Sequence, residues 1–231
     1  MRTTDRTKAF GFLLSVGLAL NSIQALADQM TRPAGGVTRI VFNTPGELVV
    51  RPGADEKVLV EAEAKVLAAL DVSVKGDTLT LASKSNFKTD KGLKYTVTIK
   101  SFRGLKTGGS GNSSIEGFSG SDVDVELAGS GDAGLKNMKA GRLGIVISGS
   151  GNAEASGSGN AVVARIEGSG NIDTTNFQAQ KVEAKLDGSG NIRVNADESL
   201  NATIGGAGNI EYKGKAKVTQ SVTGAGSVGR I

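Results

Sequence analysis

A glycine-rich tetrapeptide, Gly-Ser-Gly-Asn or a close variant of it, recurs through the C-terminal half of this sequence. Glycine-rich loops can cradle phosphate, and repeated Gly-Gly-x-Gly-x-Asp turns bind calcium. A phosphate loop needs a Gly-Lys-Ser/Thr continuation, which follows none of the copies. A calcium roll needs a carboxylate in each copy and a nine-residue period, whereas only the copy ending at Asp132 carries an acid. We therefore interpret the tetrapeptide as a structural corner rather than a ligand site.

One group of charged side chains could form a catalytic site. Arg165 and Glu167 lie two residues apart, and Lys185 and Asp187 repeat this arrangement twenty residues later. Polysaccharide-cleaving enzymes use clustered carboxylates, or a base beside a Lys or Arg, in this way. A solvated face with ion pairs between neighbouring strands explains the same residues, and we favour this interpretation because mixed charges outside a sheet are ordinary.

The composition excludes several classes of site. The sequence contains no Cys and no His, which rules out disulfides, zinc sites of the Cys/His kind and Ser-His-Asp triads. We accordingly expect a non-enzymatic protein without a metal or cofactor. Basic and acidic residues are interspersed and aromatic residues make up only 4% of the chain, so we find neither a basic stripe nor a stacking platform for nucleic acid.

The first 27 residues have the features of a Sec-type secretory signal peptide. These features are a basic start, an apolar run and an A-x-A cleavage site, at Arg2, Arg6 and Lys8, at Ala9–Leu20, and at Ala25–Ala27. The apolar run is too short to span a bilayer comfortably, and no second long run follows. We expect a mature chain that starts at Asp28, has no integral membrane segment and resides in the periplasm or outside the cell.

The spacing of the tetrapeptide predicts the architecture. Successive copies are 18 to 20 residues apart. A fixed period of this length is typical of stacked coils, in which each repeat buries its face against its neighbours. We therefore predict an all-β fold, a right-handed parallel β-helix with rungs of about 20 residues. The copies begin at Gly109, Gly129, Gly149, Gly168, Gly188, Gly206 and Gly224.

The residues between the copies alternate as strands do. Period-two alternation before each copy puts one set of apolar residues on the inner face. This set is Val123, Val125, Leu127, Leu143, Ile145, Ile147, Val162, Ala164, Ile166, Val182, Ala184, Leu186, Leu200, Ala202, Ile204, Val218, Gln220 and Val222. A second apolar residue follows each copy, and Phe118, Met138 and Phe177 recur in the middle of the rung. Each rung should therefore contain two or three short strands.

The chemistry of the tetrapeptide suits a stacked corner. Two glycines accept positive φ and so allow a sharp bend, and the residue between them must be small because identical corners lie above one another. Stacked Asn side chains can form an amide ladder, in which Asp132 would accept from the amides on both sides. The predicted corner residues are Gly109, Gly111, Asn112, Gly129, Gly131, Asp132, Gly149, Gly151, Asn152, Gly168, Gly170, Asn171, Gly188, Gly190, Asn191, Gly206, Gly208 and Asn209. An out-of-phase copy at Gly157 falls where the mid-rung corner should be.

The region before the repeats is β-rich but not periodic. We divide the chain into a signal peptide (1–27), a lead-in (28–35), a β-rich segment (36–106) that continues or caps the coil, and the repeat helix (107–231). Within the β-rich segment, Lys75–Asp77 should connect a hairpin. Residues 61–70 are compatible with a short helix or with a strand that runs into a loop.

The chain resembles the putative auto-transporter adhesin head GIN domain family. The resemblance rests on the Gly-Ser-Gly-Asn copies, on Tyr95–Leu105 and on Val72–Leu81, and it extends from about Val37 to Ile231. It implies a β-helical fold and a surface or periplasmic location, and it transfers no catalytic residue.

Three functions remain open at this stage. The first is a binding module that presents sheet faces to a glycan or a protein. The second is a polysaccharide-active enzyme that uses the face with Glu167 and Asp187. The third is an assembly protein that forms homo-oligomers through its C-terminal edge, where Gln220 occupies an inward position and no capping helix follows.

Overall fold

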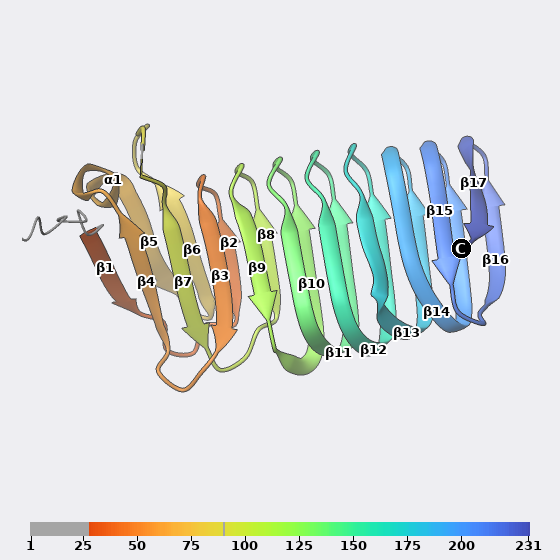
Figure 1. Cartoon of the computed structure of the whole chain (residues 1–231), viewed down its shortest axis with the longest axis horizontal. Coiled ribbons are helices and arrows are strands. Elements are labelled where there is room, and N and C mark those ends of the chain that lie inside the picture. The colour runs from red at the N-terminus through yellow and green to blue at the C-terminus, as the bar shows by residue number, and fades with distance from the viewer. Residues whose placement is uncertain (1–27, 90) are drawn as a thin grey trace, which may run out of the picture.

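Each turn of the chain adds one strand to each of two facing sheets, and successive turns stack along a single axis (Figure 1). The computed structural model describes residues 28–89 and 91–231. The chain runs down one face, bends, and returns up the other while it advances, so the coil is right-handed (Figure 1). The predicted right-handed parallel β-helix is confirmed.

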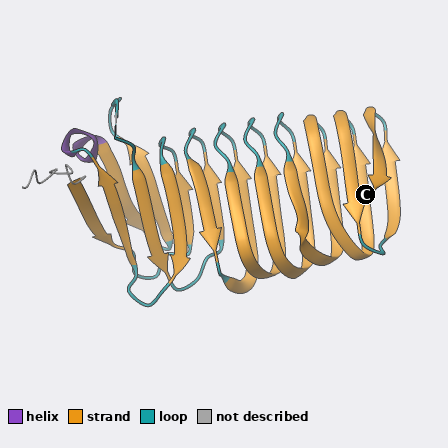
Figure 2. Ribbon diagram, viewed as in Figure 1, coloured by secondary structure: helices purple, strands orange, loops and turns teal. Residues whose placement is uncertain are grey.

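The repeat region contains the most regular part of the coil. Its strands are β10 (Ser119–Leu127), β11 (Ala133–Ile147), β12 (Ala153–Ile166), β13 (Ile172–Leu186), β14 (Ser189–Ile204), β15 (Ala207–Lys213), β16 (Lys217–Val222) and β17 (Ala225–Arg230). The long strands β11 to β14 bend in the middle and contribute to both sheets. The Gly-Ser-Gly-Asn corners line the edge of the coil that lies opposite these bends (Figure 2).

The N-terminal segment both continues and closes the coil. Its elements are β1 (Asp28–Pro33), β2 (Arg39–Phe42), β3 (Glu47–Pro52), β4 (Lys57–Ala62), α1 (Ala64–Ala69), β5 (Leu70–Lys75), β6 (Thr78–Ser83), β7 (Lys94–Ile99), β8 (Gly104–Thr107) and β9 (Asn112–Glu116). The rung of β2 and β3 lies between β6 and β7 on one side and β8 and β9 on the other, with parallel pairing throughout. The antiparallel pairs β1–β4, β4–β7 and β5–β6 close the end.

Two local predictions in this segment are resolved. Residues 64–69 form the short helix α1, which buries Val66, rather than a strand that runs into a loop. The expected hairpin is β5–β6, and Gly76 at its turn has φ of 61°. The helix lies at the closed end of the coil, where it covers the first strands (Figure 1).

A single apolar core runs along the axis of the coil. The predicted inward residues from Val123 to Ile204 are all buried, and so are Phe118, Met138 and Phe177. Each buried Val, Leu, Ile, Met or Phe among them contributes about 1.5–3 kcal/mol by leaving water. In the last rung, however, Gln220 is exposed and Val222 is 41% exposed, because no described strand covers the far side of β16.

Candidate functional site

The corners are glycine-rich because neighbouring corners touch. A Cβ built on Gly170 would lie 1.8 Å from the carbonyl oxygen of Gly151 in the preceding rung, and Gly149 shows the same conflict at 1.9 Å with Gly129. Among the corner glycines from Gly109 to Gly208, only Gly208 has a clearly positive φ, of 144°. The expected reason, positive φ, is therefore wrong for most of them, and the close approach of stacked backbones takes its place.

The Asn side chains form a ladder with a fixed direction. The Oδ1 of Asn152 accepts the side-chain amide of Asn171 at 2.9 Å, and it also accepts the backbone N–H of Asn171 at 3.2 Å. The same pattern joins Asn171 to Asn191 and Asn191 to Asn209. Each side chain thus accepts from the next rung and donates to the previous one.

Asp132 keeps the direction of the ladder on both sides but lacks the side-chain donor. Its Oδ1 accepts the backbone N–H and the amide of Asn152, at 2.7 and 3.0 Å. Toward Asn112 the backbone N–H of Asp132 donates to Asn112 Oδ1 at 2.9 Å, as in the rest of the ladder, but the carboxylate has no amide to donate a second bond. The expectation that Asp132 accepts from the amides on both sides is therefore wrong in its geometry, although the ladder passes through it.

This geometry predicts that Asp132→Asn stabilises the protein. An Asn at this position keeps the acceptor for Asn152 and adds an amide that can donate to Asn112. We expect a gain of about 0.5–1.5 kcal/mol in the free energy of unfolding, measured by urea titration. Asp132→Ala removes the acceptor and should lower that free energy by about 1 kcal/mol. A loss of stability in the Asn variant would contradict the directional ladder.

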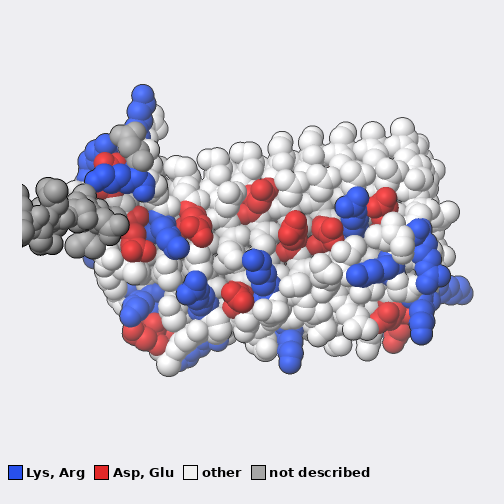
Figure 3. All heavy atoms as spheres, in the orientation of Figure 1, with Lys and Arg blue, Asp and Glu red and all other residues white. Residues whose placement is uncertain are grey.

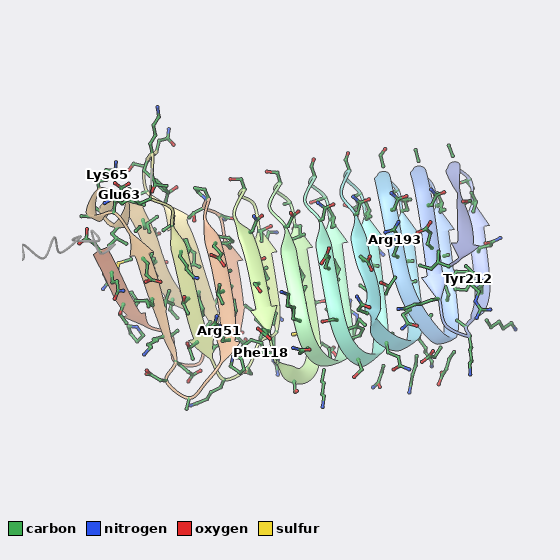
Figure 4. All side chains as sticks on the ribbon, in the orientation of Figure 1. Arg51, Glu63, Lys65, Phe118, Arg193 and Tyr212 are labelled. Carbon is green, nitrogen blue, oxygen red and sulfur yellow. The ribbon has the colours of Figure 1, made fainter. Side chains whose placement is uncertain are left out.

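An open groove of about 570 Å³ runs beside the ladder, across the strands of one sheet. We call it the ladder groove. One wall is the ladder, and the floor includes the outward residue two positions after each ladder residue. In register across β11 to β14 these floor residues are Gly134, Glu154, Asp173 and Arg193. A row of acidic and basic side chains crosses this face in Figure 3, and Arg193 is labelled on it in Figure 4.

The charged floor residues differ in how they are held. In the described part of the chain, Glu154 makes no side-chain hydrogen bond or ion pair. Asp173 Oδ1 accepts the N–H of Thr175 at 3.0 Å and its hydroxyl at 2.7 Å, so this carboxylate is fixed in place. Arg193 Nε donates to Glu211 Oε2 at 2.7 Å, and this hydrogen bond raises the pKa of Arg193. The centre of the groove thus presents an unpaired carboxylate beside an oriented one.

The groove continues toward the mid-rung corner. A second hollow of about 360 Å³ shares Gly134, Glu154 and Asp173 with the first, and Lys136 and Asn176 lie at its far side. The two hollows together form one depression that spans four rungs.

Gly134 has no structural requirement to be glycine. The nearest atom to a Cβ built there is 3.9 Å away, and its φ is not positive. Glycine in a strand costs about 0.5–1 kcal/mol relative to alanine and often marks a place where a ligand approaches closely. The absent side chain leaves open space next to Glu154 on the floor of the groove.

The predicted charged face lies on the other sheet. Arg165 and Lys185 are register partners on β12 and β13, as the sequence indicates. Lys185 Nζ pairs with Asp187 at 2.7 Å, and Arg165 pairs with Glu183 at 3.7 Å. Glu167 is exposed on the rung next to Asp187. The four residues come together, and both cations are engaged by carboxylates.

The sequence did not single out Glu154, Asp173 or Arg193. A signal for them existed, because each stands two residues after a ladder residue and alternation places that position outside. Within residues 28–89 and 91–231 there is no group of three or more His, Cys, Asp or Glu side chains arranged to hold a metal ion. Among the described residues there is also no helix with the length and apolar character needed to cross a bilayer.

Comparison with known proteins gives a consistent set of relatives. A family model described as "Putative auto-transporter adhesin, head GIN domain" matches residues 37–216. A solved "putative adhesin" from Bacteroides fragilis is 28% identical, with a TM-score of 0.82, and the match covers 88% of this chain and 97% of that one.

Two structures from Parabacteroides distasonis share the fold at lower identity. A "putative adhesin" is 21% identical over 88% of this chain and 96% of its own, and a "putative lipid binding protein" is 24% identical over 90% and 98%. Both have a TM-score of 0.69. No curated protein matches this sequence.

Proposed function

This chain belongs to the putative auto-transporter adhesin head GIN domain family, and we propose that it is an exported, non-enzymatic module that binds an extended glycan in the ladder groove. Its family's description as an adhesin supports a binding role and a location at the cell surface or in the envelope. The signal-peptide features that support export lie outside the described residues.

The observation that carries the proposal is the repetition of polar groups along the groove. Asn152, Asn171 and Asn191 form one row, and Glu154, Asp173 and Arg193 form a parallel row. Both rows repeat at the strand spacing of about 4.8 Å. A polymer that lies across the strands meets equivalent groups at each rung if its own repeat is similar.

A glycan fits this spacing better than a peptide does. The repeat of an extended peptide is about 3.3 Å per residue, so a peptide that lies across the strands soon loses register with the rungs. A pyranose unit in an extended chain is close in length to the strand spacing. The second N–H of each ladder amide and the floor carboxylates can bond sugar hydroxyls.

A glycan array with a groove variant tests this function. We expect the purified protein to bind a defined set of glycans, and Gly134→Val to weaken that binding at least tenfold because the new side chain fills the floor. Gly120→Val is the matched control, since a Cβ built on Gly120 also meets no close atom and Gly120 lies outside the groove. Neither change should lower stability, because each replaces a strand glycine. Absence of glycan binding, or equal binding by the Gly134 variant, would refute the proposal.

The relatives described as adhesins support a non-enzymatic role, and so does the pairing of Arg165 and Lys185 with carboxylates. The polysaccharide-active alternative needs a carboxylate and a cation that are free to act on a substrate. Asp187 is instead ion-paired to Lys185, two residues before it.

Self-assembly is a second candidate function, and the unequal ends of the coil favour it. The N-terminal end is closed by α1 and by antiparallel strands, whereas β16 and β17 each pair on one side only among the described strands. Val222 and Ile231 are 41% and 58% exposed there. An unprotected strand edge tends to pair with another chain, so we propose that two copies pair through β16.

The mass in solution tests this assembly. We expect light scattering to give a dimer for the wild type and a monomer for Val222→Lys, because the charge replaces an exposed apolar side chain on this edge. Val74→Lys is the matched control, as Val74 is equally exposed, at 42%, on β5 near the closed end. A monomeric wild type at high concentration would rule out pairing through this edge.

A further inference from the structure

We propose that the ligand of the ladder groove is an amino-sugar glycan whose free, protonated amines lie against Glu154 and Asp173. The inference rests on the proposed function and adds the chemical class of the glycan. It depends on the shape of the groove, on the charges at its centre and on the donors in its wall.

The centre of the groove is acidic although the chain as a whole is not. The full sequence carries a net charge of +4, yet Asp132, Glu154 and Asp173 line adjoining positions on three successive rungs. Lys136 lies at the far side, and Arg193, the register partner of Asp173, is already bonded to Glu211 through its Nε. A ligand with positive charge along its middle therefore complements this surface.

The space above Gly134 gives an amine access to the carboxylate. Gly134 and Glu154 are register partners on neighbouring strands, and the absent side chain at Gly134 leaves the flank of Glu154 open. Glu154 has no protein partner among the described residues, so an incoming ammonium replaces only water. Asp173 offers its Oδ2 one rung further, because Oδ1 is occupied by Thr175.

The ladder wall supplies the remaining contacts of a sugar. Each Asn amide has two N–H donors and spends one of them on the previous rung, which leaves the other for a ligand. Hydroxyl oxygens of successive sugars can accept from Asn152, Asn171 and Asn191. The Asn side chains of the wall thus bind the hydroxyl groups of the glycan, and the carboxylates of the floor favour a glycan with positive charge.

Acidic glycans are disfavoured by the same geometry. A uronic acid or sialic acid chain would place carboxylates against Glu154 and Asp173, and like charges at contact are destabilising. An N-acetylated chain keeps the hydroxyls but loses the ammonium and adds an acetyl group that must fit above Gly134.

The decisive experiment compares two tetrasaccharides with the same backbone, the glucosamine tetramer and its fully N-acetylated form. Calorimetry on the full exported protein at about pH 5.5 keeps the amine protonated and the carboxylates ionised. We expect the amine form to bind at least tenfold more tightly, and we expect this preference to shrink between about 0.15 M and about 1 M salt because the groove is open to solvent. Glu154→Gln should abolish the preference, whereas Glu167→Gln, an exposed acid outside the groove, should leave it intact.

The outcomes separate this inference from the function on which it rests. If the acetylated tetramer binds as well as the amine, or if the two Gln variants lose the preference equally, the amine assignment is wrong and the glycan groove stands. If neither tetramer nor any array glycan binds, both the assignment and the proposed function fail.

Discussion

Gly170→Ala should be among the most damaging single substitutions in the repeat region, with a loss of about 4–5 kcal/mol in the free energy of unfolding. The added Cβ would lie 1.8 Å from the backbone oxygen of Gly151, and a backbone atom cannot move aside as a flexible side chain can. Relief requires the two rungs to separate, which weakens the amide ladder from Asn152 to Asn171 and the strand pairing beside it. Urea titration followed by circular dichroism measures the loss.

The same substitution at Gly134 is the matched control for this prediction. Gly134 lies in a strand of the same coil, but its built Cβ meets nothing closer than 3.9 Å. Gly134→Ala should therefore leave stability unchanged or raise it by about 0.4–1 kcal/mol, through the smaller entropy of the unfolded chain. Equal effects at the two positions would show that stacking contact is not what requires glycine at the corners.

Phe177→Ala should cost about 3–5 kcal/mol, the second large effect that we expect. The ring is fully buried at the mid-rung corner of β13, and the out-of-phase tetrapeptide lies beneath it in the preceding rung. A Cβ on Gly159 would approach the ring to 2.9 Å, so Gly159 provides the space that the ring fills. Removal of the ring leaves a cavity between two rigid backbones that cannot collapse into it.

Phe87→Ala tests whether burial in the coil is the cause. Phe87 is only half-buried in the loop between β6 and β7, so the same truncation there should cost about 1 kcal/mol. Thermal unfolding of the two variants beside the wild type makes the comparison. Similar losses would mean that Phe177 does not anchor the mid-rung corner.

The coil could be predicted from the sequence because the residues that specify its corners and strands recur at a fixed period. The tetrapeptide spacing gives the rung length, and alternation before each copy identifies the buried side chains from Val123 to Ile204. Both patterns are local, and each stacked rung repeats them. Gln220 and Val222 alternate in the same way but are exposed, because an inward residue is buried only when a rung lies on each side of its own.

The N-terminal order could not be predicted in the same way. The strands β2 and β3 lie between strands that follow them in the chain, β6 with β7 and β8 with β9. No spacing in the sequence records this placement, because it depends on which non-consecutive strands pair. The choice between helix and strand at residues 61–70 was similarly undetermined by local pattern.

The candidate site was only partly accessible from the sequence. Corner residues were recognised because they repeat, whereas Gly134, Glu154, Asp173 and Arg193 share a position but not a residue type. That these residues line one groove is evident only from the strand register, which places them side by side. The requirement for glycine at the corners was also not visible in the sequence, because the atom that a Cβ would strike belongs to another rung.

The placement of β2 and β3 has a mechanical consequence for a protein under tension. Among the described strands, the rungs from β11 to β15 pair with the rung on either side, and β16 and β17 pair on one side only, so a pull on the C-terminus can unwind the coil one turn at a time. A released turn of about 20 residues lengthens the tether by roughly 65 Å. At the other end, the rung of β2 and β3 is clamped between strands that enter the coil later, so it cannot peel away until those strands are released. We therefore expect a pulling force to unfold the C-terminal rungs first and the N-terminal rungs last.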